Sequence, residues 1–479
     1  MKNKNWNFVY SEGHSLLLNE VFFNAFTNFP QIPGIFKTIL YINRHGDQTC
    51  YVPPSEMTRV RQQGKIFFDV KYRAQFKKNI ANQAAKFNLF WQKYKKTKIL
   101  LLNNDQLLSL FKEYIDNLTL MCAYYQVSGG RSYPLLEEYV KQEMYSYFNK
   151  NDVPKYYSLV LTSTKIDLLE REEIALLKLS AKKAINSKQL IDHAINYAFH
   201  YLCGYNDEKI LSSLKQRILD LKKKYKSDSL YINKFSKERR SLMNQRNRIM
   251  KKLIKNKQLV NTIQFLREQG RLRFEYKEWF FGAEYKFLYI FKEIAKRLGI
   301  SLEDYFLSYR IDDTIKFLQN DIKVSQTTIY ERSKIFIFYQ NKGKKYFYSG
   351  KSAEEKEEVL MGTAIKQESV VRGVSANPGK VSGKVRIILP KSFEHIQRAL
   401  TYFQQGEVLI TTMTQPSLIS IMKRACAMVT NQGGITSHAA IISREFDIPC
   451  IVGTHIATEV FKDGDMVEVD ADHGIVRKL

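Results

Sequence analysis

A short stretch near the C-terminal end, residues 430–445, constrains the fold of this chain more than any other. The apolar residues 427–430 predict a short strand, and Gly433 and Gly434 interrupt it. A helical pattern of apolar residues begins directly after His438. The stretch therefore predicts a strand, a tight turn and a helix, with His438 at the N-terminus of the helix.

This position has a chemical consequence for His438. A helix N-terminus presents unpaired N–H groups and the positive end of the helix dipole, which favour a bound phosphate. The turn at Gly433 and Gly434 can add further amides, and the hydroxyls of Thr436 and Ser437 can cap the helix or contact phosphate oxygens. A neutral imidazole is also a competent nucleophile toward phosphorus. A lone histidine here would usually only cap its turn, but these neighbours favour His438 as a catalytic residue.

Several separated motifs of the last hundred residues then show a resemblance to a known family. They are residues 373–386, 406–410, 413–416, the stretch around His438, and 448–454. In this order they resemble the swivelling phosphohistidine domain, or mobile domain, of the phosphoenolpyruvate-utilising enzymes, which include phosphoenolpyruvate synthase and rifampin phosphotransferase. The resemblance implies that His438 carries a phosphoryl group. Many members have an acidic residue where this chain has Asn431 and Gln432, which bears only on the detail of the turn.

A weaker resemblance concerns residues 269–304, which look like the last long helix before the histidine domain in rifampin-phosphotransferase-like proteins. Arg273 and Lys277 are one helical turn apart in this stretch. They are candidate cations for an anionic acceptor, and the alternative is an ordinary surface or structural pair. No spacing of histidines, cysteines or carboxylates in the chain predicts a metal site, so His193 and His200 are interpreted as core or surface residues.

The patterns along the chain predict a multidomain α+β protein, with a mostly helical N-terminal region before a C-terminal α/β domain. Residues 1–95 are predicted as a mixed segment with strands near 34–42 and 64–70. Residues 96–325 form a helical domain that holds the acceptor, 326–371 a β-hairpin and linker, and 372–479 the swivelling domain. Cys450 is predicted to lie in a buried strand of that last domain as a small apolar residue.

The amino-acid composition bears on which partners the protein binds and on the cellular compartment in which it is expected. The net charge is +27, but residues 372–479 hold 12 Lys and Arg against 10 Asp and Glu, so the excess lies upstream. Because the charge is dispersed along helices, solvated helix faces are favoured over a nucleic-acid surface. Five scattered cysteines, no apolar run long enough for a membrane and no signal-peptide core predict a cytoplasmic protein.

The resemblance also implies a donor and an acceptor. In the family an ATP-grasp domain phosphorylates the histidine, yet the first 370 residues show no Gly-rich phosphate loop and few strands. We expect neither that domain nor the barrel domain of the phosphoenolpyruvate enzymes. The predicted function is a phosphotransferase, incomplete without a separate ATP-grasp protein that supplies ATP and magnesium. The phosphoryl group would pass from His438 to a small-molecule acceptor. Alternatives are a regulatory or binding protein that keeps the fold, or a polyanion-binding protein.

Overall fold

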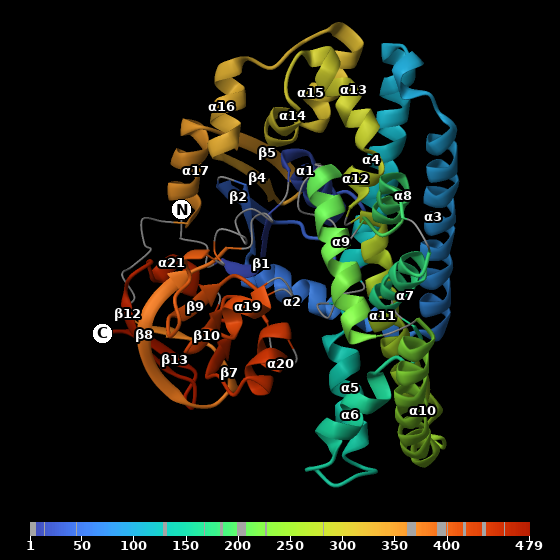
Figure 1. The fold of residues 1–479 in the computed structure, drawn as a ribbon, viewed down its shortest axis with the longest axis vertical. Helices are drawn as coiled ribbons and strands as arrows, with labels where there is room; N and C mark the ends of the chain where they lie inside the picture. The colour runs from blue at the N-terminus through green and yellow to red at the C-terminus, as the bar shows by residue number, and fades with distance from the viewer. Residues whose placement is uncertain are drawn as a thin grey trace.

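The computed structural model describes residues 6–479, except 14, 45, 128–131, 167, 183–184, 199–206, 226–227, 281, 362–369, 390–398, 400, 415–417, 434–436 and 455. Figure 1 shows a tall, mostly helical part and, at the lower left, a separate C-terminal sheet with its own helices. The predicted multidomain α+β fold, helical first and α/β at the end, is confirmed. No described helix has the length and the hydropathy needed to cross a membrane.

A five-stranded antiparallel sheet joins segments that lie about 300 residues apart in the sequence. Its order is β1-β3-β2-β4-β5, and Tyr41 of β2 lies opposite Phe338 of β4. The hairpin predicted at 336–348 is confirmed as β4 and β5, but its pairing with the N-terminal strands was not foreseen. The strands are β1 (Asn7–Gly13), β2 (Ile39–Arg44), β3 (Asp47–Val52), β4 (Ile335–Asn341) and β5 (Lys344–Ser349).

The strand predicted at residues 64–70 is wrong. Gly64–Phe68 forms a short 3-10 helix, η1, and the next residues open a long α-helix. Phe67 is fully buried, and its ring centroid lies 5.2 Å from that of Phe76 and 4.9 Å from that of Tyr133. Packing against rings that are distant in sequence overrides the local strand preference of aromatic residues.

Helices make up most of residues 54–334, as the pattern over 105–318 predicts. Within this bundle α4 packs against α1, α3, α11 and α15. The helices are α1 (Leu16–Thr27), α2 (Pro54–Gln63), α3 (Val70–Lys96), η2 (Ile99–Leu101), α4 (Asn104–Val127), α5 (Pro134–Met144), α6 (Val153–Leu161), α7 (Leu168–Ser180), α8 (Ser187–Asn196), α9 (Asp207–Lys224), α10 (Asp228–Leu253), α11 (Lys257–Phe280), α12 (Ala283–Lys286), α13 (Leu288–Leu298), α14 (Leu302–Ser308), α15 (Ile311–Asn320), α16 (Gln326–Lys334) and α17 (Lys351–Met361).

The C-terminal domain is built on a sheet of eight strands in the order β6-β13-β12-β8-β9-β10-β11-β7. Neighbours from β8 to β11 are parallel, and the outer pairs are antiparallel. The strands are β6 (Val370–Arg372), β7 (Val374–Asn377), β8 (Lys380–Ile387), β9 (Val408–Thr411), β10 (Ala427–Thr430), β11 (Cys450–Val452), β12 (Met466–Asp470) and β13 (Ile475–Lys478).

Both faces of this sheet are covered, which explains why its central strands are continuous apolar runs. Met428 and Val429 are adjacent in β10 and belong to separate core clusters, one on each face. The Met428 cluster includes Ala439 and Ala440 of α20 (His438–Glu445), and the Val429 cluster includes Ala457 of α21 (Ala457–Val460). The helix that begins at His438 is therefore held against one face of the sheet by its small apolar residues.

Candidate functional site

The strand and the helix predicted on either side of the turn at His438 are confirmed at the level of the backbone. β10 ends at Thr430, and α20 begins at His438. Ser437 is the N-cap residue, and its hydroxyl accepts a hydrogen bond from the backbone N–H of Ala440 at 3.4 Å. Gly434 and Thr436 lie outside the described residues, as does the side chain of His438. Their roles, and a phosphate contact of Ser437, stay predictions.

Gly433 is required by the backbone of this turn. Its φ of +111° lies in a region that residues with a side chain rarely adopt. A Cβ atom at this position would lie 2.9 Å from both Cβ and Oγ of Ser437, closer than non-bonded atoms approach. The absence of a side chain at Gly433 therefore lets the turn close against the cap of α20.

We expect Gly433→Ala to destabilise the C-terminal domain by about 3 kcal/mol, through an unfavourable φ and overpacking together. Gly406→Ala is the matched control, because Gly406 also has a positive φ (+87°) but a Cβ atom there would meet nothing within 4 Å. It is expected to cost about 1 kcal/mol. Urea unfolding, with alkylation of Cys450 as its readout, measures the free energy of unfolding of both variants. Equal losses of stability in the two variants would contradict the steric argument.

Asn431 is buried at the start of the turn. It is 2% exposed, and its amide nitrogen donates to the Thr458 hydroxyl at 2.6 Å. Its amide oxygen accepts from the backbone N–H of Thr458 at 3.1 Å. Asn431 thus ties the start of the turn to α21.

Cys450 lies beneath α20 and is a packing residue, as predicted. Its side chain is fully buried in the same cluster as Ala440, and burial raises the pKa of its thiol to about 12. A thiol with such a pKa is almost wholly protonated at neutral pH and is a poor nucleophile. The nucleophile that the sequence predicts for this turn is therefore His438 and not this neighbouring thiol.

The two cations predicted for an acceptor site share α11. Arg273 is half-buried, and its guanidinium lies 4.7 Å from the ring centroid of Tyr125 on α4 and donates to the Tyr125 hydroxyl at 3.3 Å. The side chain of Lys277 lies outside the described part of the chain. Arg273 therefore has at least one structural contact, and its part in binding an acceptor stays a prediction.

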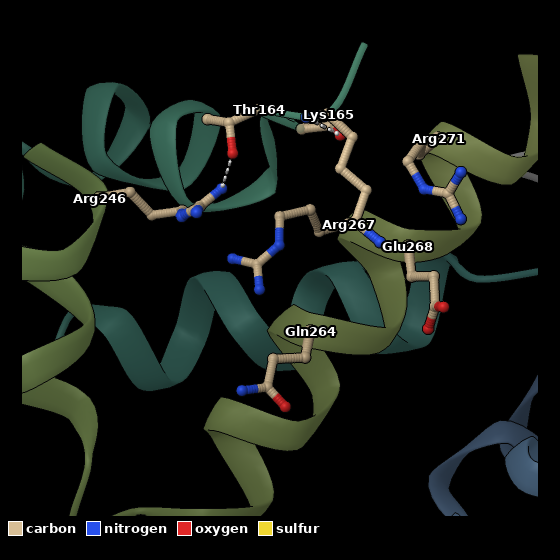
Figure 2. Close-up of a pocket in the computed structure, with 8 residues that line it drawn as sticks. Thr164, Lys165, Arg246, Gln264, Arg267, Glu268 and Arg271 are labelled. Atoms are coloured by element: carbon tan, nitrogen blue, oxygen red, sulfur yellow. Dashed lines mark hydrogen bonds between the residues drawn. The ribbon is translucent and has the colours of Figure 1, made fainter. Parts of the chain in front are cut away.

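Described residues of the helical region line at least two cavities. One, of about 1070 Å³, is lined by residues of α3, η2, α8 and α13 with apolar rings and chains such as Trp91, Tyr94, Leu100 and Tyr289. The other, of about 270 Å³, is polar and lies between the segment after α6 and helices α10 and α11. Its lining residues are Ser163, Thr164, Lys165, Arg246, Gln264, Arg267, Glu268 and Arg271 (Figure 2).

Sequence reasoning missed the arginines of the smaller cavity. Arg267 and Arg271 are one turn apart on α11, a local signal of the same kind as Arg273 and Lys277. Arg246 joins them from α10, which contacts α11 in the fold. Only the tertiary structure brings Arg246 near Arg267 and Arg271. The spacing of residues along α11 therefore cannot distinguish this pair from Arg273 and Lys277.

A buried ionic cluster accounts for His193 without a metal. Glu172 of α7 is fully buried, and its Oε1 lies 3.0 Å from Nε2 of His193. Arg217 of α9 donates to both carboxylate oxygens of Glu172, at 3.0 and 2.6 Å. In the described ranges, no group of three His, Cys, Asp or Glu side chains is placed to hold a metal ion. His193 is a core residue, one of the two roles predicted for it.

Comparison with known proteins finds relatives that match the C-terminal region. Residues 403–474 match the family model described as "PEP-utilising enzyme, mobile domain". A probable phosphoenolpyruvate synthase of Archaeoglobus fulgidus is 46% identical over 107 residues, 22% of this chain and 13% of that protein. The phosphoenolpyruvate synthase of Pyrococcus furiosus is 44% identical over 127 residues, 26% of this chain and 14% of that protein.

The matched segment is a small part of each relative. A probable phosphoenolpyruvate synthase of Methanothermobacter thermautotrophicus is 44% identical over 110 residues, which are 15% of its length. The chain thus spans about 13 to 15% of the length of these curated relatives. A structure of aconitase X from Thermococcus kodakaraensis is 18% identical over 23% of this chain and 98% of that chain, with a TM-score of 0.18. Residues 403–474, which contain α20, are similar to the mobile domain of phosphoenolpyruvate-utilising enzymes.

Proposed function

We propose that the chain is a phosphotransferase component in which His438 carries a phosphoryl group from a donor to an acceptor. The observation that supports this most is that the segment matched to the mobile-domain family contains His438 at the first position of α20. The free amides of a helix N-terminus favour the negative charge of a phosphorylated histidine. Gly433 and Ser437 hold the backbone of the turn in place before any phosphate arrives.

The proposed reaction has two steps. A nitrogen of the neutral His438 ring attacks a phosphorus atom of ATP, so that an N–P bond forms as a phosphoric anhydride bond breaks and its oxygen leaves with the nucleotide. An acceptor oxygen then attacks the same phosphorus, and the N–P bond breaks to return the neutral histidine, while the acceptor gives up its proton. Each step is mainly positioning and neutralisation of charge.

The donor in this proposal is a separate ATP-grasp protein that binds ATP and magnesium and phosphorylates His438 in trans. The acceptor is a small molecule bound by the helical region. The cavity of about 1070 Å³ between α3, α8 and α13 is large enough for one. Arg273 and Lys277 on α11 are the candidate cations for the negative charge of the transferred phosphoryl group, although Arg273 is not among the described lining residues of that cavity.

Intact-mass spectrometry at neutral to alkaline pH tests the trans donor. The purified chain is incubated with ATP and magnesium, alone and with a candidate ATP-grasp protein. We expect the mass of one phosphoryl group to be gained only when the partner is present, because the partner is proposed to bind the nucleotide. Equal phosphorylation by ATP alone would overturn the trans donor. No adduct in any mixture, with the fold intact, would favour a regulatory or binding role.

A further inference from the structure

The smaller cavity of the helical region gathers positive side chains from three parts of the chain. Arg246 comes from α10, Arg267 and Arg271 from α11, and Lys165 from the segment that follows α6. Figure 2 shows Arg246 and Arg267 extending toward one another across the cavity, with Thr164 above Arg246. Glu268 is the acidic residue among the described lining residues, and its carboxylate is already bonded to Lys77 of α3.

The two facing arginines are held by neutral groups. Arg246 donates from Nη1 to the carbonyl oxygen of Thr162 and to the hydroxyl of Thr164, each at 3.3 Å. Arg267 donates to the carbonyl oxygen of Val160 at 3.2 Å. Within the described part of the chain, neither guanidinium forms an ion pair with a carboxylate. Both retain N–H groups that no carboxylate of the described residues satisfies.

This arrangement is unfavourable in the absence of a counter-charge. Burial lowers the pKa of the Arg246 guanidinium. Burial and the charge of Arg246 lower the pKa of Arg267, and the nearby Glu268 carboxylate offsets only part of that shift. Two partly desolvated positive charges of like sign therefore face one another. Arg271 differs, because it forms an ion pair with Glu275 on its own helix. A bound anion would neutralise the pair and supply acceptors for its N–H groups.

We propose that this cavity binds the phosphate group of a small phosphorylated molecule, with Arg246 and Arg267 as its main ligands. Guanidinium groups hold phosphate oxygens through paired N–H donors, which suits two arginines that approach from opposite sides. The hydroxyl of Ser163 and the amine of Lys165 line the same space and can serve further oxygens. A volume of about 270 Å³ accommodates a phosphate with a small organic group. The proposal does not depend on the chemistry of His438.

Isothermal titration calorimetry of the full chain with inorganic pyrophosphate and with inorganic phosphate, without ATP or a partner, tests the site. We expect the wild-type chain to bind pyrophosphate, and Arg246→Gln and Arg267→Gln each to weaken binding about tenfold or more through loss of a charge-assisted contact. Arg248→Gln is the matched control, because Arg248 is exposed on α10 two residues from Arg246 and does not line the cavity. It should bind as the wild type does.

Thermal unfolding separates a binding defect from a folding defect. Pyrophosphate should raise the Tm of the wild type and of Arg248→Gln but not of the two cavity variants. Without anion, those variants should melt no lower than the wild type, because each removes one of two like charges. Arg246→Gln is the cleaner variant, because it leaves the cavity's other arginine, Arg267, with its own bond to the Val160 carbonyl.

Three results would overturn the site. They are no binding of either anion by the wild type, equal binding by the wild type and both cavity variants, and binding of a single-stranded RNA oligonucleotide without binding of the small anions. The last result would assign the basic helices to a nucleic-acid backbone. Since this titration involves no phosphoryl transfer, its failure leaves the carrier role of His438 unaffected, and the mass experiment on His438 likewise leaves this site unaffected.

Discussion

Replacing His438 by alanine is expected to abolish the phosphoryl adduct completely. The proposed intermediate is a bond between phosphorus and an imidazole nitrogen, and alanine offers no nucleophile in its place. The helix start should survive, because the Ser437 cap and the packing of Ala439 and Ala440 do not depend on the imidazole. The measurement is intact-mass spectrometry of the wild type and the variant in the mixture of ATP, magnesium and partner that labels the wild type.

His473→Ala is the matched control for that experiment. His473 lies in the same domain, its side chain is 73% exposed, and its ring bonds to Asp470 rather than to the turn at α20. This variant should gain one phosphoryl group as the wild type does. The adduct should also be lost in acid and retained in alkali, as the N–P bond of phosphohistidine is. An adduct on His438→Ala that is stable in acid would place the phosphate on a hydroxyl and contradict the proposal.

The local part of the candidate site could be predicted from the sequence because its signals are adjacent. An apolar run, a glycine pair and a serine cap within a dozen residues specify a strand, a turn and the first residue of α20. None of these signals depends on knowing what packs against the turn.

The features that the sequence did not reveal depend on distant contacts. The pairing of β2 with β4 joins strands across almost the whole helical region, and no local pattern specifies it. Phe67 lies in a 3-10 helix because other rings surround it, although residues 64–70 form a short apolar run typical of a strand. The facing of Arg246 and Arg267 is likewise set by the packing of two helices. Charge counted along the chain could therefore indicate solvated faces but could not locate a cavity.

Breaking a buried ion pair in the C-terminal domain is expected to destabilise that domain as much as Gly433→Ala does. Glu407 precedes β9, and its side chain is 5% exposed. Arg386 of β8 donates to it from Nε and Nη2, the latter at 2.6 Å, and the backbone N–H of Gln404 donates at 2.9 Å. Glu407→Gln would leave the Arg386 charge without its buried partner, at a cost of about 3 kcal/mol near neutral pH. The exposed Glu445→Gln should change stability by less than about 0.5 kcal/mol.

The pH dependence of that loss identifies the carboxylate as its cause. Burial raises the pKa of Glu407, but the hydrogen bonds from Arg386 and Gln404 outweigh burial and leave the pKa below its ordinary value. A carboxyl group with a lowered pKa contributes stability above the pKa of the unfolded chain, about 4.3, and loses it as the pH falls through the lower folded value. The difference between wild type and Glu407→Gln should therefore be constant from neutral pH to about pH 5 and shrink below that.

Alkylation of the buried Cys450, located by peptide mass spectrometry across a urea series, reports the opening of this domain alone. Because Cys450 is present in both proteins, comparing wild type and Glu407→Gln at each pH removes the effect of pH on the alkylation rate of the thiol itself. A difference that persists unchanged in acid would mean that the substituted amide disturbs packing rather than charge. A difference that shrinks in acid would show that the ionised Glu407, by joining β8 to the start of β9, stabilises the sheet on which the turn before His438 is built.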